Sequence, residues 1–174
     1  MKSGTKAFGE KTPEFALATQ NVQSWKSKYA TIDDIPESEI PKAYDLRNIG
    51  GYDFTGNVRD QGPCGSCYTM SFIQAIESRL KYKYAHLGEM ASKPISPQFV
   101  LMGNYMSEGC SGGLAIFDGY LAEYGHLTTE ECAPYQASTK GDKFENYKNC
   151  PKYAKINKST YLRGYNFNPS VSDI

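Results

Sequence analysis

Apolar residues recur every three or four positions from residue 68 to about residue 84, and this spacing predicts an amphipathic helix. The apolar positions are Met70, Ile73, Ile76, Leu80 and Tyr84. Charged residues between them, Glu77, Arg79 and Lys81, are expected on other faces of the helix. The helix would begin directly after Cys67.

A second, shorter helix is predicted from a start signal further along the chain. Ser96 is a typical N-cap residue, and Pro97 is favoured at the first helical position. The helix is then expected to continue through Phe99, Val100 and Met102.

A third helix is predicted from about residue 114 to residue 124, with Gly125 as a typical stop. The residues expected to face inward are Phe117, Tyr120 and Leu121. Beyond this helix, residues 159–163 are expected to form a strand that begins a second half of the fold.

Composition agrees with one globular domain. The chain has 174 residues, is 40% hydrophobic, and has 19 Lys plus Arg against 19 Asp plus Glu. This balance does not point to nucleic acid, and no run of apolar residues is long enough to span a membrane. Residues 1–40 are interpreted as a prosegment remnant or linker, and residues 41–174 as the domain. Because no signal peptide is visible, Met1 is not expected to be the natural start of the precursor.

Candidate chemistry is concentrated in residues 61–68, where Gln61 precedes Cys67 by six positions. A cysteine attacks as its thiolate, a form that a helix N-terminus and a neighbouring imidazolium favour. The Gln61 amide and the backbone N–H of Cys67 would then share the oxyanion of an acyl-transfer intermediate. Each such donor typically contributes about 3–4 kcal/mol.

These residues carry a family resemblance. Cys-Gly-Ser-Cys-Tyr at 64–68, preceded by Gln-Gly-Pro, resembles the active-site signature of papain-like cysteine proteases. Residues 109–113 resemble the family's substrate-binding glycine pair, residues 128–135 the segment after its third helix, and residues 41–47 the start of the mature enzyme. The resemblance covers residues 41 to about 159. It implies that Cys67 is the nucleophile, Gln61 the oxyanion donor, and Gly112 and Gly113 the substrate-binding backbone.

The resemblance also implies the fold. We expect the papain-like α+β architecture, with this chain supplying the helical half and only the start of the β half. The active site would lie in the cleft between the two halves, and a peptide or protein would be the substrate.

Five cysteines are present. The resemblance implies that Cys64 pairs with Cys110 and Cys132 with Cys150, which leaves Cys67 as the free thiol. An odd number suits a thiol enzyme in an oxidising compartment, so we expect a lysosomal or secreted zymogen.

Within the family, the dipeptidyl-peptidase I (cathepsin C) branch is the most similar. The spacing of residues 45–61 resembles that branch, Tyr68 replaces the usual tryptophan, and residues 18–25 resemble the end of its prosegment. Two features depart from that branch. A cysteine is missing near Gly103, and Ile116 stands where that branch uses a tyrosine to hold chloride. We expect no cofactor and no metal, and Ile116 disfavours chloride.

The catalytic base is not expected within this chain. In this family the histidine and its asparagine follow the cysteine by roughly 130–150 residues, beyond about position 197. The two histidines present, His86 and His126, are interpreted as ordinary surface or packing residues. We therefore expect a second chain or further segment to supply the base, and this chain alone to be inactive.

Other functions compete with this interpretation. Cys64 and Cys67 form a C-x-x-C, so a redox pair is one alternative, although no buried strand precedes it. Zinc is a weaker alternative because the other cysteines lack close partners. The main alternative to an enzyme is a non-catalytic structural or interaction module built on a half domain.

Overall fold

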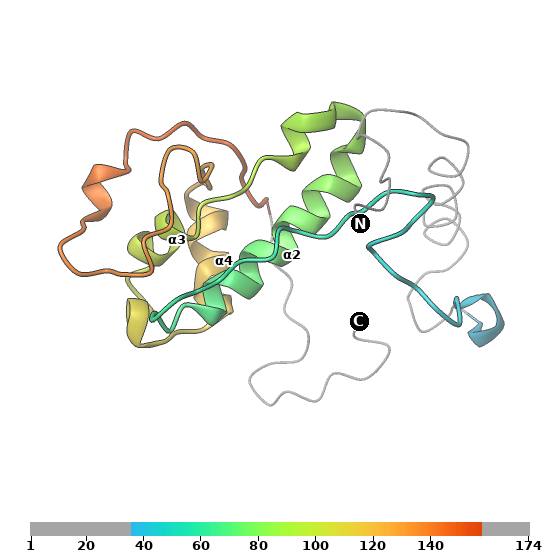
Figure 1. Ribbon diagram of the computed structural model, residues 1–174, viewed down its shortest axis with the longest axis horizontal. Helices are drawn as coiled ribbons and strands as arrows, with labels where there is room; N and C mark the ends of the chain where they lie inside the picture. The colour runs from blue at the N-terminus through green and yellow to red at the C-terminus, as the bar shows by residue number, and fades with distance from the viewer. Residues whose placement is uncertain (1–35, 158–174) are drawn as a thin grey trace.

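The computed structural model describes residues 36–157, except for the side chains of residues 86–89. Most of the predicted prosegment or linker, residues 1–40, and all of the predicted strand at 159–163 lie outside this range. Within it, helices and loops form the structure, and strand pairing is limited to isolated bridges such as Leu127 with Ala154. Figure 1 shows one long helix with two shorter helices gathered beside one end of it.

Three α-helices build the described part of the chain, in agreement with the three helices predicted. They are α2 (Cys67–Tyr84), α3 (Pro97–Gly103) and α4 (Ala115–Tyr124). Short 3-10 turns lie between and around them: η2 (Glu37–Glu39), η3 (Ala85–Ser92), η4 (Gly109–Ser111) and η5 (Phe144–Asn146).

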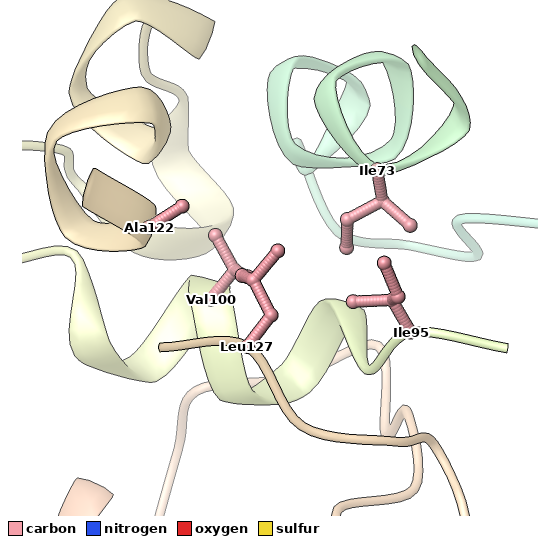
Figure 2. Close-up of a cluster of buried hydrophobic side chains, with 5 residues drawn as sticks. All are labelled: Ile73, Ile95, Val100, Ala122 and Leu127. Carbon is pink, nitrogen blue, oxygen red and sulfur yellow. The ribbon is translucent and has the colours of Figure 1, made fainter. Parts of the chain in front are cut away.

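The central core forms where the three helices meet. Its fully buried members come from different parts of the chain and point toward one another (Figure 2): Ile73, Ile95, Val100, Ala122 and Leu127. The predicted apolar residues Ile76 and Leu80 of α2 pack against this cluster. Apolar burial therefore holds α2 against α3 and α4.

The start of α3 follows the sequence signal. Ser96 Oγ accepts a hydrogen bond from the backbone N–H of Phe99 at 2.9 Å, and Pro97 occupies the first turn. The same hydroxyl donates to the carbonyl oxygen of Ala133 at 2.5 Å. Ser96 therefore caps the helix and also ties it to the later loop.

The inward face of α4 was predicted incorrectly at one position. Tyr120 is 38% exposed, whereas Asp118 and Ala122 are fully buried. Asp118 and Ala122 are four residues apart and share a helix face, and Tyr120 lies between them on another side. The Tyr120 ring instead stacks on Tyr124, with ring centroids 6.3 Å apart.

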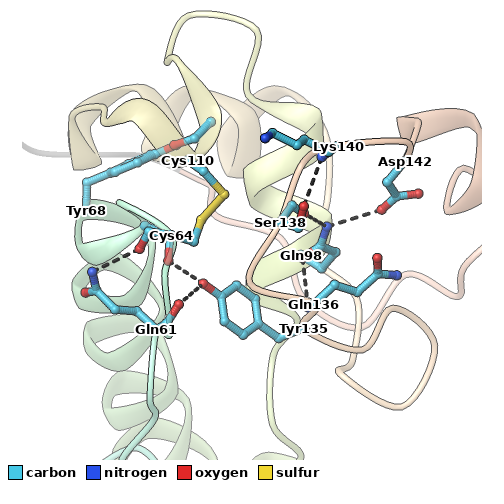
Figure 3. The surroundings of a disulfide bond; sticks show 12 residues. Gln61, Cys64, Tyr68, Gln98, Cys110, Tyr135, Gln136, Ser138, Lys140 and Asp142 are labelled. Atoms are coloured by element: carbon cyan, nitrogen blue, oxygen red, sulfur yellow. Dashed lines mark hydrogen bonds between the residues drawn. A yellow bond between two sulfur atoms is a disulfide. The ribbon is translucent and has the colours of Figure 1, made fainter.

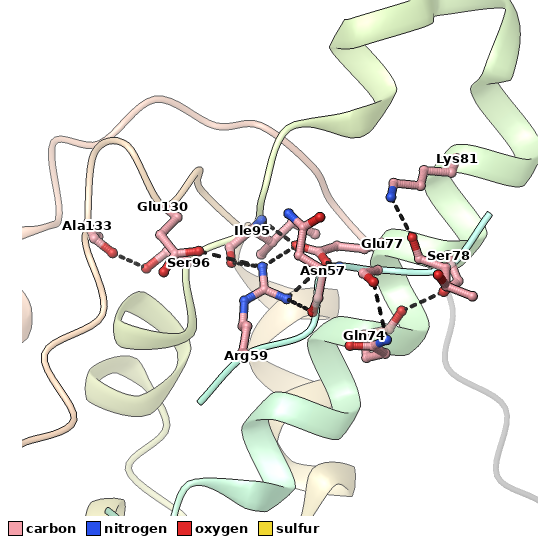
Figure 4. A network of polar contacts seen from close by, with 12 residues as sticks. Asn57, Arg59, Gln74, Glu77, Ser78, Lys81, Ile95, Ser96, Glu130 and Ala133 are labelled. Atoms are coloured by element: carbon pink, nitrogen blue, oxygen red, sulfur yellow. Dashed lines mark hydrogen bonds and ion pairs between the residues drawn. The ribbon is translucent and has the colours of Figure 1, made fainter. Parts of the chain in front are cut away.

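Glu77 also departs from the prediction that it lies on another face than the apolar residues, because it is buried one turn after Ile73. Its side chain is only 4% exposed and accepts two hydrogen bonds from the Arg59 guanidinium, at 2.5 and 3.0 Å. The backbone N–H of Ile95 donates to it at 2.7 Å, and Figure 4 shows this arrangement. We call Arg59, Glu77 and Ile95 the Glu77 bracket. It fastens the segment before the active-site loop to the middle of α2.

Candidate active site

Cys67 is the first residue of α2, and it is a free, exposed cysteine. The backbone N–H groups of Cys67, Tyr68 and Thr69 precede the first intrahelical bond, in which Met70 donates to Ser66. Ser66 occupies the N-cap position but makes no capping hydrogen bond. The thiol therefore stands at an uncapped helix N-terminus, where partial positive charge favours an anion.

Ser66 fails to cap because its hydroxyl is engaged elsewhere. The Ser66 and Tyr135 hydroxyl oxygens lie 2.6 Å apart, and the Tyr135 hydroxyl donates to the backbone carbonyl of Gln61 at 2.8 Å. Tyr135 has a single hydroxyl hydrogen, so Ser66 is the donor of the first bond. Tyr135 thereby fixes the approach loop from two sides (Figure 3).

Gln61 is held with its amide beside the loop that leads to Cys67. Its Nε2 donates to the carbonyl oxygen of Cys64 at 2.9 Å. A primary amide carries two N–H hydrogens, so one donor is left for a ligand. The structure thus leaves two kinds of donor open, the Gln61 amide on the loop that leads to Cys67 and the backbone of the first helical turn.

Both disulfides implied by the resemblance are present: Cys64 with Cys110, and Cys132 with Cys150. The first joins the approach loop to η4 (Figure 3), and the Gly65 N–H donates to the Cys110 carbonyl at 2.8 Å beside it. Because Cys64 is bonded to Cys110, it does not pair with Cys67, and the redox interpretation of the C-x-x-C is wrong. No cysteine among the described residues except Cys67 remains free for a metal.

The two predicted substrate-binding glycines differ in their surroundings. Gly112 has φ +129°, and both of its backbone polar groups are used inside the loop, by Gly109 and Glu108. No hydrogen bond among the described residues engages the backbone of Gly113. A Cβ on Gly113 would lie 2.5 Å from Ser107 Oγ and 2.7 Å from the Tyr68 ring. Gly113 is therefore the glycine of the pair with an open backbone, next to the Tyr68 ring, and only glycine fits there.

Neither histidine is brought to the thiol. His86 lies in η3, beyond the 18 residues of α2, a length of about 27 Å at 1.5 Å per residue. His126 packs its ring against Phe99, with centroids 5.1 Å apart. Burial, with a smaller effect of Lys152, lowers the pKa of His126. The contacts of His126 agree with the predicted packing role.

Two polar groups near the site were missed at the sequence level. Asp118 is a fully buried carboxyl on α4, and Tyr135 is the hydroxyl that fixes the approach loop. Asp118 is spaced by four residues from Ala122, so the helical period alone gave a signal for its burial. Tyr135 gave none, because its contacts join residues about 70 positions apart.

Across residues 36–157, no group of three or more His, Cys, Asp or Glu side chains is arranged to hold a metal ion. None of the helices in this range is both long and apolar enough to cross a membrane.

Comparisons with known proteins agree on one family. A sequence model of papain family cysteine proteases matches residues 40–171. Fruit bromelain of Ananas comosus is 28% identical over 142 residues, covering 79% of this chain and 34% of that protein. Procathepsin L of Mus musculus is 32% identical over 134 residues, covering 75% of this chain and 38% of that protein. The chain thus spans well under half the length of these curated relatives.

A solved structure gives the same match in three dimensions. Bromelain protease from Ananas comosus, in complex with the E64 inhibitor, superposes with a TM-score of 0.55 at 26% identity. The match covers 68% of this chain and 50% of that one.

Proposed function

Because this chain belongs to the papain family of cysteine proteases, we propose that the whole protein is a cysteine-type peptidase with Cys67 as its nucleophile. The fold is papain-like, and the mostly helical described residues are consistent with the helical half of that fold. The observation that carries the proposal is a free, exposed thiol at an uncapped helix N-terminus, preceded by a loop in which the Gln61 amide is tethered.

The reaction follows from these positions. The Cys67 thiolate adds to the scissile carbonyl carbon, and the electron pair of the carbonyl moves onto its oxygen. The backbone N–H of Cys67 and the second N–H of Gln61 Nε2 donate to that oxyanion. The intermediate collapses to a thioester as the amine leaves with a proton, and water then releases the acid and restores the thiol. The substrate backbone would run in extended form along Gly113 and Gly112.

The proton donor to the leaving amine is proposed to lie outside this chain. His126 packs on Phe99 and has its pKa lowered by burial, and His86 lies beyond the far end of α2. A histidine and an orienting asparagine in a further segment or second chain would complete the site. The 174 residues alone are therefore expected to show no turnover.

A finer proposal concerns specificity and location. The 45–61 spacing and Tyr68 support dipeptidyl-peptidase I-like release of dipeptides, without chloride because Ile116 replaces the tyrosine. Two disulfides support a lysosomal or secreted location for a protein made as a zymogen. Cleavage of a dipeptidyl amide, but not of the same amide with a blocked amino terminus, would support this specificity.

Replacing the nucleophile tests the main proposal. In the whole protein, Cys67→Ser is expected to lower peptide hydrolysis by at least about a thousandfold while the melting temperature stays unchanged. Glu131→Gln, a change of similar size at an exposed side chain, serves as a matched surface control. Hydrolysis that survives Cys67→Ser would contradict the proposal, and a wild-type protein without hydrolysis would favour the non-catalytic module.

A further inference from the structure

A buried carboxyl lies next to the loop that carries Gly113. Asp118 of α4 has no exposed surface, and its Oδ1 accepts a hydrogen bond from Asn104 Nδ2 at 2.6 Å. Asn104 is itself nearly buried and ends α3, where its backbone N–H donates to Val100. The contact therefore joins α4 to the C-terminal end of α3.

Asn104 extends this contact into the loop before Gly113. Its Nδ2 also donates to Ser107 Oγ at 3.0 Å, and its Oδ1 accepts from the backbone N–H of Met106 at 3.1 Å. Ser107 Oγ in turn lies 2.5 Å from the point that a Cβ of Gly113 would occupy. A continuous set of contacts thus runs from Asp118 through Asn104 and Ser107 to Gly113.

The other side of the carboxyl faces the first turn of α2. Thr69, two residues after Cys67, is fully buried and close enough to influence the pKa of Asp118. Yet Thr69 Oγ1 and Asp118 Oδ2 are both buried without a hydrogen bond of ordinary geometry among the described residues. Buried polar atoms without partners are rare because each is costly, so this pair requires an explanation.

We propose that Asp118 is a positioning residue of the proposed peptidase, which joins Thr69 to Asn104 and holds Gly113 in register with Cys67. A hydrogen bond between Thr69 Oγ1 and Asp118 Oδ2, in which the hydroxyl donates to a carboxylate or accepts from a neutral acid, would leave Oδ1 to accept from Asn104. Both unpartnered atoms are then satisfied, and α2, α3 and α4 are tied together beneath the substrate-binding edge. This inference rests on the proposed function.

The electrostatics of the position agree with a neutral form in mild acid. Burial raises the pKa of Asp118 to about 7, while the Asn104 amide and the nearby Thr69 hydroxyl oppose that rise. No charged group among the described residues contributes to this shift. The titratable neighbour is Tyr68 on α2, whose own pKa is raised by burial and, in part, by Asp118; α3 presents only the neutral Asn104. Above pH 7 the carboxylate is ionised in a buried position, and the cost of burying that charge weakens the contact between α2 and α4.

The test compares two reagents at Cys67 in the whole protein between pH 5 and 8. Iodoacetamide reports thiol reactivity alone, whereas a peptidyl epoxide must also align along Gly113. The rate constant for the epoxide divided by that for iodoacetamide therefore measures how well the substrate-binding edge is positioned. For the wild type we expect this ratio to fall about tenfold as pH rises through 7. Asp118→Asn, which imitates the neutral acid, should keep the low-pH ratio throughout. Asp118→Ala should give the low ratio at every pH.

Two further variants keep the test decisive if Asp118→Ala does not fold. Ser107→Ala removes one link and should lower the ratio about threefold without removing its pH dependence. Asp53→Asn is the control variant. The Asp53 carboxylate accepts hydrogen bonds from the backbone N–H and the hydroxyl of Thr55, so this variant should match the wild type. An Asp118→Asn profile identical to the wild type would overturn the inference and leave the proposed function standing. Wild-type protein that reacts with iodoacetamide but never with the epoxide would overturn both.

Discussion

Helix α2 carries two polar regions of opposite character, the Glu77 bracket at its middle and the Cys67 turn at its start. In the bracket, a carboxylate 4% exposed is matched by Arg59 and a backbone N–H. At the start, the helix is uncapped and the thiol is exposed. The difference indicates that one region stabilises the helix while the other is left open for a ligand. Disrupting each region should therefore change a different measurement.

Glu77→Ala is expected to have the largest effect on stability. It removes the buried carboxylate that pairs with the Arg59 guanidinium and leaves only the partly exposed Glu130, at 3.6 Å. Breaking a buried pair typically lowers the free energy of unfolding by about 3–5 kcal/mol. Chemical denaturation of the whole protein measures this. Arg47→Ala, which breaks an exposed pair with Asp45, is the control and should leave stability unchanged. Equal effects of the two variants would contradict the role given to the bracket.

Removing the disulfide between Cys64 and Cys110 should lower both the free energy of unfolding and the rate of Cys67 labelling. Replacing Cys64 and Cys110 with alanine opens a loop of 46 residues and should lower the free energy of unfolding by about 4 kcal/mol. The same change at Cys132 and Cys150 opens 18 residues and should lower it by about 3 kcal/mol. Only the first pair should also slow epoxide labelling of Cys67. Equal slowing in both variants would show that the first disulfide has no special part in positioning.

Stability should depend on pH through Asp118. Its pKa of about 7 in the folded protein exceeds the ordinary value of 3.8, so the folded state binds the extra proton. The associated stability is present in acid and is lost as pH rises through 7, by on the order of 2 kcal/mol between pH 5 and 8.

His126, whose pKa is lowered by burial, acts in the opposite direction. The informative quantity is therefore the difference between wild type and Asp118→Asn in denaturation at each pH. The variant should gain stability relative to wild type as pH rises. A difference that stays constant from pH 5 to 8 would show that Asp118 does not titrate in this range.

The smallest expected effect is a local one at the substrate-binding edge. Gly113→Ala brings a Cβ within 2.7 Å of the Tyr68 ring, so it should slow peptidyl-epoxide labelling about tenfold by displacing this edge. Iodoacetamide labelling should be unchanged, because the thiol itself is not touched. If both reagents slowed equally, Gly113 would have a general structural role instead.

The parts of the structure that follow local rules were predictable. The start of α3 at Ser96 and Pro97 needed only a cap signal, and the extent of α2 needed only its apolar period. The helical period places Glu77 one turn after Ile73, but its pairing with Arg59 was not predictable, because Arg59 is 18 positions away in the sequence. Tyr120 was placed inward on hydrophobicity alone, but Asp118 has hydrogen-bond partners inside and Tyr120 is 38% exposed.

Some residues of the candidate site could likewise be predicted from the sequence, and others could not. Cys67, Gln61 and the two disulfides follow from a contiguous motif and its resemblance to a family. The preference for Gly113 over Gly112 depends on backbone hydrogen bonds that only the folded loop defines. The Tyr135 contact with Gln61 joins residues 74 positions apart, and the Asn104 contact with Asp118 joins the ends of two different helices, so no local pattern predicts them.

The most direct measurement is to incubate the whole protein with a peptidyl epoxide and to map the modified residue by mass spectrometry. A reactive nucleophile at the start of α2 predicts one adduct, on Cys67, together with complete loss of peptide hydrolysis. A folded protein whose reduced, exposed Cys67 stays unmodified would contradict the assignment of Cys67 as the nucleophile.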